Sequence, residues 1–75
     1  MDFTQPNDVF DRMLELCNKY ENEWQKLTVF ERATNLHMAI INIHPFSDGN
    51  GRIARLVMNY ELIKNNYPPV LINES

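Results

Sequence analysis

The chain has 75 residues, a formal net charge of −3 and a sequence pI near 5.2. A domain of this size buries only about 60% of the surface that its unfolded chain exposes, so a single unit with a thin core is expected over residues 1–75. The acidic balance argues against nucleic-acid and anionic-membrane partners, because affinity for phosphate backbones depends on clustered lysine and arginine.

The first predicted helix begins after Pro6, where Asn7 or Asp8 can cap it. Apolar residues then recur at helical spacing, which predicts one face buried in the core. This stripe consists of Val9, Met13, Leu16, Tyr20 and Trp24, and it is widened by Phe10, Leu14 and Cys17.

The second predicted helix starts at Thr28, because Thr28-Val29-Phe30-Glu31 has the pattern of a capping box. It should end at His44, since Pro45 disfavours helical dihedral angles in the residue before it. The inward face is expected to contain Phe30, Ala33, Leu36 or His37, Ile40 and Ile41. On this face His37 is interpreted as a core histidine and not as a site residue.

The third predicted helix opens around Gly49 to Gly51 and ends at Asn65-Asn66, where asparagine can adopt the left-handed cap conformation. Its expected core positions are Ile53, Leu56, Val57, Tyr60 and Ile63. The following Tyr67-Pro68-Pro69 predicts an extended exit toward Val70-Leu71-Ile72. The fold class is therefore all-α, with three helices.

Residues 44–55 read His-Pro-Phe-Ser-Asp-Gly-Asn-Gly-Arg-Ile-Ala-Arg, which is typical of a phosphate-binding site. His44 is the candidate base, because histidine is the side chain that exchanges a proton near neutral pH. Asp48 offers hard carboxylate oxygens for a Mg²⁺ ion shared with a polyphosphate. Phe46 is expected to be buried and to hold the shape of the loop.

The glycines of the same segment suit close approach of an anion. Gly49 and Gly51 leave room at the start of a helix, whose free N–H groups favour negative charge, and Asn50 adds an amide donor. Arg52 and Arg55 lie three residues apart on one side of that helix, where their guanidinium groups can bind phosphate oxygens.

These residues resemble the motif of the Fic family, H-x-F-x-D/E-G-N-G-R-x-x-R, at every specified position. The resemblance continues through Leu56-Val57-Met58-Asn59 and Asn66-Tyr67-Pro68-Pro69-Val70. Upstream it includes Glu31-Arg32-Ala33 and His37, so it covers nearly the whole chain. It implies an all-α fold with the motif loop between helices two and three, and transfer of AMP from Mg-ATP to a protein hydroxyl.

The resemblance also implies a role for each motif residue. His44 would deprotonate a Ser, Thr or Tyr hydroxyl of the target protein, and Asp48 would hold the Mg²⁺. The Gly49-Asn50-Gly51 backbone would bind phosphate, with the Asn50 side chain helping to place the α-phosphate. Arg52 would bind the β-phosphate and Arg55 the γ-phosphate.

Fic proteins also carry flanking helices and a β-hairpin flap that docks the target peptide, so residues 1–75 are expected to be the core of a longer domain. The inhibitory S/T-x-x-x-E-G/N motif of some members does not occur in this sequence, which leaves an inhibitory partner or extension open. The lone Cys17 and the lack of a long apolar run or a basic signal start favour a cytoplasmic location. The sequence does not indicate an oligomeric state.

Several alternatives compete with this interpretation. The chain could be a nucleotide-binding or inhibited Fic module without turnover, or it could transfer phosphate as the Doc relatives do, although these depart from the Gly49-Asn50-Gly51 pattern. A purely structural helix-loop-helix would not require so many motif residues in register. Zinc binding by His44 and Asp48 lacks visible third and fourth ligands, and a DNA-binding helix-turn-helix lacks a basic recognition helix.

Overall fold

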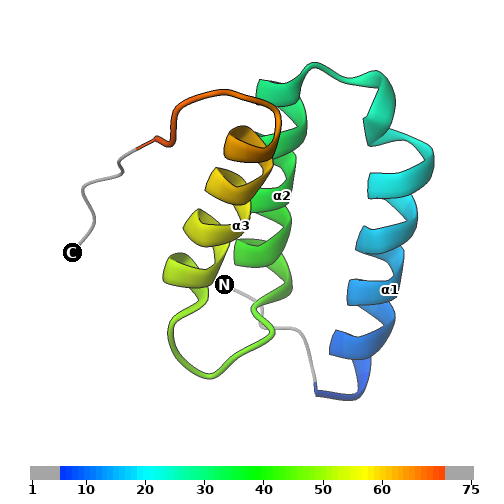
Figure 1. Ribbon diagram of the computed structural model, residues 1–75. Coiled ribbons are helices and arrows are strands. Elements are labelled where there is room, and N and C mark those ends of the chain that lie inside the picture. The colour runs from blue at the N-terminus through cyan, green and yellow to red at the C-terminus, as the bar shows by residue number, and fades with distance from the viewer. Residues whose placement is uncertain (1–5, 71–75) are drawn as a thin grey trace.

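A computed structural model describes residues 6–70 and contains three α-helices with one short 3₁₀ helix. The elements are α1 (Pro6–Asn22), η1 (Trp24–Lys26), α2 (Val29–Ile43) and α3 (Asn50–Lys64). The central helix α2 has α1 on one side and α3 on the other, and both run antiparallel to it (Figure 1). The predicted all-α fold is confirmed. None of the helices described is long and apolar enough to cross a membrane.

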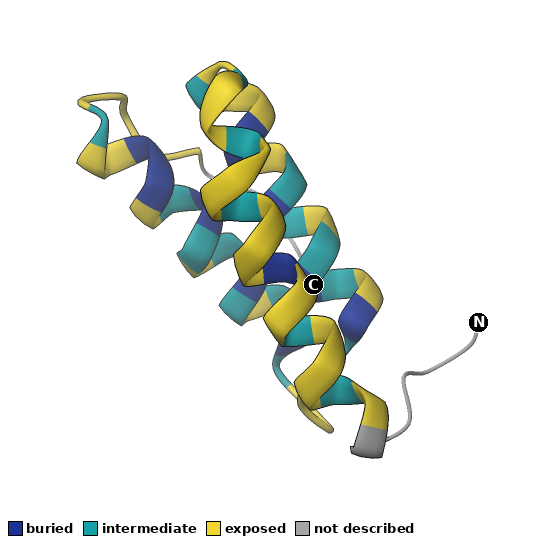
Figure 2. Ribbon diagram, turned by 90° about the vertical axis from the view of Figure 1, so that its right-hand side faces the viewer, coloured by how far each residue is buried: buried dark blue, intermediate teal, exposed yellow. Residues whose placement is uncertain are grey.

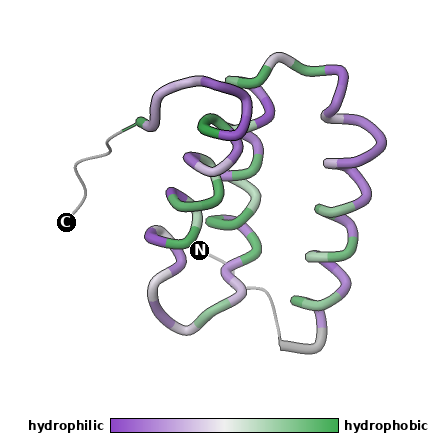
Figure 3. The backbone as a smooth tube through the Cα atoms, in the orientation of Figure 1, coloured by the Kyte–Doolittle hydropathy of each residue, from purple (hydrophilic) through white to green (hydrophobic). Residues whose placement is uncertain are grey.

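Helix α1 packs through a narrower stripe than the sequence predicted. Leu16 is buried, and Val9, Met13 and Tyr20 are half-buried against the core. Phe10 and Leu14, which were expected to widen the stripe, are 68% and 50% exposed, and Cys17 is exposed as well. The outward side of α1 is mostly exposed (Figure 2), while its apolar residues face α2 (Figure 3). Among the described helices α1 packs mainly against α2, so a single stripe suffices.

The ends of α1 differ in detail from the prediction. The helix already includes Pro6, so a residue capping it would lie outside the described part of the chain, and Asp8 instead lies in the first turn. There its negative charge favours the positive end of the helix dipole. Trp24 belongs to η1 and still packs against the core, as predicted.

Both predicted ends of α2 are confirmed. The Glu31 N–H donates to Thr28 Oγ1 at 3.2 Å and the Thr28 N–H donates to Glu31 Oε1 at 3.0 Å, which is the predicted capping box. At the other end His44 is the C-cap, with left-handed φ and ψ of 54° and 57°. Since Pro45 disfavours a right-handed helical conformation at His44, the chain leaves the helix there.

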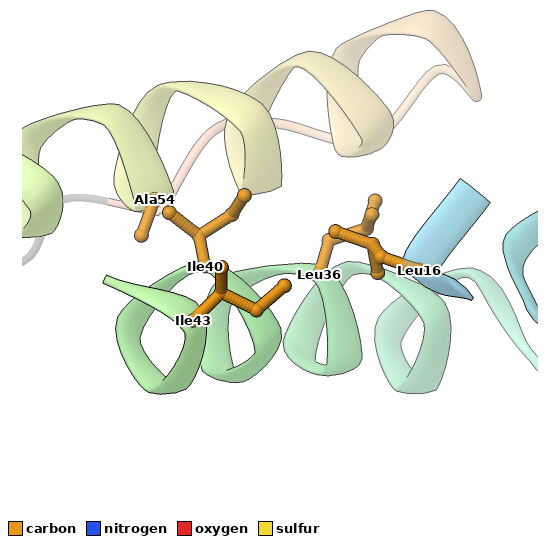
Figure 4. Packing of buried hydrophobic residues seen from close by; sticks show 5 residues of the cluster. All are labelled: Leu16, Leu36, Ile40, Ile43 and Ala54. Atoms are coloured by element: carbon orange, nitrogen blue, oxygen red, sulfur yellow. The ribbon is translucent and has the colours of Figure 1, made fainter. Parts of the chain in front are cut away.

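The core lies along both sides of α2. One cluster joins α1, α2 and α3 through Leu16, Leu36, Ile40, Ile43 and Ala54 (Figure 4). A second cluster joins α2 to α3 through Ala33, Met58 and Leu62. Phe30 was expected to face inward but is 52% exposed, and its ring instead meets the edge of Tyr67 with centroids 5.1 Å apart.

The prediction for the inward face of α3 was wrong at its largest residues. Leu56, Tyr60 and Ile63 are 60%, 67% and 55% exposed. The residues that α3 buries are Asn50, Ala54, Met58, Glu61 and Leu62. Ala54 is 0% exposed, and so small a residue allows α3 to approach α2 closely.

A buried polar cluster explains this orientation of α3. The Glu61 carboxylate accepts hydrogen bonds from Arg32 Nε and from Tyr20 Oη, both at 2.6 Å. Arg32 Nη1 also donates to the Trp24 and Leu27 carbonyls at 3.3 and 3.2 Å. Burial raises the pKa of Glu61, but the hydrogen bonds from Tyr20 and Arg32 and nearby positive charges outweigh this effect and leave it below its usual value.

The chain leaves α3 as predicted, through Asn65 and Asn66. Asn66 has a φ of 70°, and the Tyr67 N–H donates back to the Leu62 carbonyl at 2.9 Å. The segment that follows has no regular secondary structure up to Val70. The predicted continuation through Leu71 and Ile72 lies outside the described residues.

Candidate functional site

The motif loop connects α2 to α3 at one end of the molecule (Figure 1). It begins at His44, the C-cap of α2, and ends at Gly49, the N-cap of α3. His44 is half-buried, whereas Asp48 is exposed. The two helix ends therefore place the candidate base and the glycine turn on either side of one short loop.

Asn50 determines how this loop is folded. It is 6% exposed, and both polar groups of its side chain bond to the backbone of Phe46. The Phe46 N–H donates to Asn50 Oδ1 at 2.9 Å, and Asn50 Nδ2 donates to the Phe46 carbonyl at 2.7 Å. The first helical residue of α3 thus holds the middle of the loop.

The N-terminus of α3 is suited to an anion. Gly49 has a φ of 80°, a conformation that residues with a Cβ rarely adopt, and it provides no side chain to cap the helix. At the N-terminus of α2, by contrast, Thr28 and Glu31 form a capping box. The N-cap of α3 thus makes no side-chain cap hydrogen bond, and of its first N–H groups that of Gly49 donates to Asp48 Oδ1, whereas the N-terminus of α2 is closed by its own capping box.

The two arginines lie on the first turns of α3. Arg52 is exposed and lines a hollow of about 210 Å³ together with Asp48 and Gly49. Arg55 is half-buried one turn later, and its Nη1 lies 3.4 Å from the place where a Cβ on Gly51 would be. An alanine Cβ at that position would come into van der Waals contact with the guanidinium group.

Asp48 has an exposed carboxylate, and its Oδ1 accepts a hydrogen bond from the Gly49 N–H at 2.9 Å. Within residues 6–70, no three His, Cys, Asp or Glu side chains lie together as a metal-binding group. One carboxylate combined with substrate phosphates is a common way of holding Mg²⁺ in proteins, and Asp48 fits that arrangement.

Two features of the site differ from the sequence interpretation or were missed by it. Phe46 was expected to be buried but is 49% exposed, and it lines the hollow together with Ile53. The loop is held through the Phe46 backbone and not by burial of its ring. The bonding of Asn50 to Phe46 was also missed, although an asparagine at the first helical residue, four positions after Phe46, was a usable signal.

A larger apolar groove, of about 360 Å³, lies between α1 and α3 over α2. Three of its polar side chains are engaged with one another, since Tyr20 Oη donates to Glu61 and accepts a hydrogen bond from Lys64 Nζ at 2.9 Å. The smaller hollow, by contrast, is lined by Phe46, Asp48, Gly49 and Arg52 of the motif.

The model of the Fic/DOC family matches residues 1–62 of the chain. The chain belongs to this family. The match extends through α1 and α2, the motif loop and most of α3. The motif loop of this family lies between α2 and α3 of the chain.

Curated relatives carry the name of an enzyme. The protein adenylyltransferase fic-1 of Caenorhabditis elegans is 35% identical over 69 residues, which cover 89% of this chain and 13% of the relative. The protein adenylyltransferase Fic of Aedes aegypti is 52% identical over 42 residues, or 56% of this chain and 8% of the relative. The protein adenylyltransferase Fic of Nematostella vectensis is 44% identical over 57 residues, which cover 68% of this chain and 13% of the relative. The chain thus spans only a small part of the length of these relatives.

Proposed function

We propose that this protein is an adenylyltransferase that moves AMP from ATP to a Ser, Thr or Tyr hydroxyl of a target protein. The observation that carries the proposal is the short loop between α2 and α3. It joins His44 to the N-terminus of α3, which has no side-chain cap and is followed by Arg52 and Arg55. The relatives named as protein adenylyltransferases support the same reaction.

In the proposed reaction His44 acts as the general base. It accepts the proton of the target hydroxyl as the oxygen attacks the α-phosphorus. The new oxygen–phosphorus bond forms while the bond from the α-phosphorus to the oxygen bridging to the β-phosphate breaks. Pyrophosphate leaves and the target carries AMP, so no covalent intermediate with the enzyme is needed.

The other motif residues place ATP and compensate its charge. The backbone N–H groups at Asn50 and Gly51 bind phosphate oxygens, and that of Gly49 joins them when it exchanges its bond to Asp48 Oδ1 for one to phosphate. Arg52 binds the β-phosphate and Arg55 the γ-phosphate. Transfer at phosphorus depends mainly on positioning and electrostatic stabilisation, and two guanidinium groups at a helix N-terminus provide both.

Asp48 is the residue that would hold Mg²⁺. When bound, the ion would neutralise negative charge on the α- and β-phosphates. The exposed position of the Asp48 carboxylate, on the hollow that Arg52 also lines, supports this assignment.

Intact-mass and peptide mass spectrometry after incubation with Mg-ATP and cell lysate tests the proposal, with the His44→Ala variant as control. We expect an AMP adduct on a hydroxyl that depends on His44. A phosphate adduct would instead indicate transfer of the Doc type. ATP binding without any adduct would indicate a nucleotide-binding module that does not turn over.

A further inference from the structure

We propose that Asn50, within the adenylyltransferase site proposed above, is a positioning residue whose amide holds the motif loop and thereby sets the place of His44 relative to the N-terminus of α3. The effect of Asn50 on catalysis rests on the proposed function, whereas its effect on the loop does not. It differs from the role that the family resemblance implies, in which the Asn50 side chain helps to place the α-phosphate.

The hydrogen bonds of the side chain support this role. Asn50 Oδ1 accepts from the Phe46 N–H at 2.9 Å while Asn50 Nδ2 donates to the Phe46 carbonyl at 2.7 Å. The side chain is therefore engaged at both ends of its carboxamide. Because Asn50 is only 6% exposed, binding a phosphate directly would require it to give up bonds in a buried setting.

The position of Phe46 explains how the hydrogen bonds of Asn50 affect His44. Phe46 lies two residues after His44, which has already left α2 in the left-handed conformation. The Phe46 side chain is half exposed and contributes little burial to hold the loop. The bonds from Asn50 therefore tie the segment beside His44 to α3, the helix that also carries Arg52 and Arg55.

The same helix provides a matched control. Asn59 makes an equivalent pair of bonds, from its Nδ2 to the Val70 carbonyl at 3.1 Å and from the Val70 N–H to its Oδ1 at 2.8 Å. This second pair holds the segment after α3 and lies outside the motif. An Asn59→Ala variant therefore loses the same kind of side-chain hydrogen bonds while leaving the motif loop unchanged.

Hydrogen exchange followed by NMR on the nucleotide-free chain is the first measurement. Asn50→Ala should speed exchange of the Phe46 N–H about tenfold, as expected for the loss of a protein hydrogen bond. The amides of Ile40 and Leu62 in the same sample report whether the fold persists. Asn59→Ala should leave the Phe46 N–H unchanged and speed exchange at Val70. Equal exchange of the Phe46 N–H in wild type and Asn50→Ala would overturn the proposal.

Steady-state AMP transfer is the second measurement. We expect Asn50→Ala to lower kcat at least tenfold while KM for ATP changes less than threefold, and Asn59→Ala to alter neither. A loss of ATP affinity as large as that of Arg52→Ala, with kcat retained, would show that Asn50 binds nucleotide directly and would overturn the proposal. If the wild-type chain transfers no AMP, the proposed function fails, and the exchange comparison still decides whether Asn50 holds the loop.

Discussion

Asn50 and Arg52 lie two positions apart at the start of α3, yet their surroundings assign them different roles. Asn50 is buried and hydrogen-bonded within the protein, whereas Arg52 is exposed on the hollow beside Asp48. His44 lies at the other end of the loop, as the C-cap of α2. The proposed function therefore places the base at the end of α2 and phosphate binding at the start of α3.

This separation predicts different effects of two substitutions. His44→Ala should reduce AMP transfer by at least about a hundredfold, the usual contribution of a general base, while leaving ATP affinity nearly unchanged. Arg52→Ala should weaken ATP binding about tenfold or more and lower transfer as well, because a charge-assisted hydrogen bond to phosphate is lost. Calorimetric titration with ATP and the transfer assay measure the two effects. Equal loss of ATP affinity in both variants would contradict these roles.

The two glycines of the motif differ in backbone conformation, and so in how well they tolerate a side chain. At Gly49 an added Cβ would meet nothing within 4 Å, but the φ of 80° is strained for any residue with a side chain. We expect Gly49→Ala to lower the free energy of unfolding by about 1–2 kcal/mol. Gly51→Ala should leave stability unchanged or raise it slightly, since Gly51 is within a helix where alanine is favoured. Urea unfolding of both variants makes the comparison, and a larger loss at Gly51 would contradict it.

At the scale of elements, the helix ends follow local signals and the helix faces follow distant contacts. The capping box at Thr28 and the exit at Pro45 depend on residues within four positions of each other. The inward face of α3 depends on Glu61, whose partners Arg32 and Tyr20 lie on other helices. A face that buries a carboxylate cannot be recognised from apolar spacing alone.

A pair of leucine substitutions tests the orientation of α3. Leu62 is 1% exposed and Leu56 is 60% exposed, although apolar spacing favoured Leu56 for the core. Leu62→Ala should cost about 2–5 kcal/mol of stability, the range for a buried leucine, whereas Leu56→Ala should cost less than about 0.5 kcal/mol. Chemical denaturation of the chain measures both. A larger loss for Leu56→Ala would mean that α3 is rotated.

At the scale of the whole molecule, side-chain hydrogen bonds hold both ends of the helix bundle. At one end Glu61 connects α1, α2 and α3 through Tyr20 and Arg32. At the other end Asn50 connects α3 to the motif loop. Between these ends α3 lies against α2 through Ala54 (Figure 4). The spacing of His44 from the glycine turn at the start of α3 therefore depends on the packing of the two helices.

The Glu61 cluster predicts how stability depends on pH. The pKa of Glu61 in the folded chain is below its usual 4.5, because hydrogen bonds and positive charges outweigh the effect of burial. Its contribution to stability is therefore fully present above the unfolded pKa and is lost as the pH falls through the folded pKa. Urea unfolding between about pH 6 and pH 2 should show this loss as a steep acid limb.

The Glu61→Gln variant isolates this contribution. It should be less stable at pH 6, by about 3 kcal/mol, because the charge of Arg32 remains buried without its partner. Its stability should also fall less steeply with acid than that of the wild type. Parallel acid limbs in the two proteins would assign the pH dependence to other carboxylates.

The sequence by itself determined the helical class, the ends of α2, the exit from α3 and the presence of the Fic motif. Each of these depends on residues close together in the chain, such as Thr28 with Glu31 or His44 with Pro45. Only the tertiary structure decided which face of α3 is buried and what the Asn50 side chain contacts. The buried face of α3 depends on Arg32 and Tyr20, which lie 29 and 41 residues from Glu61 and offset the cost of burying its carboxylate. The contacts of Asn50 depend on the loop folding back onto α3, so that the Asn50 side chain bonds to the backbone of Phe46.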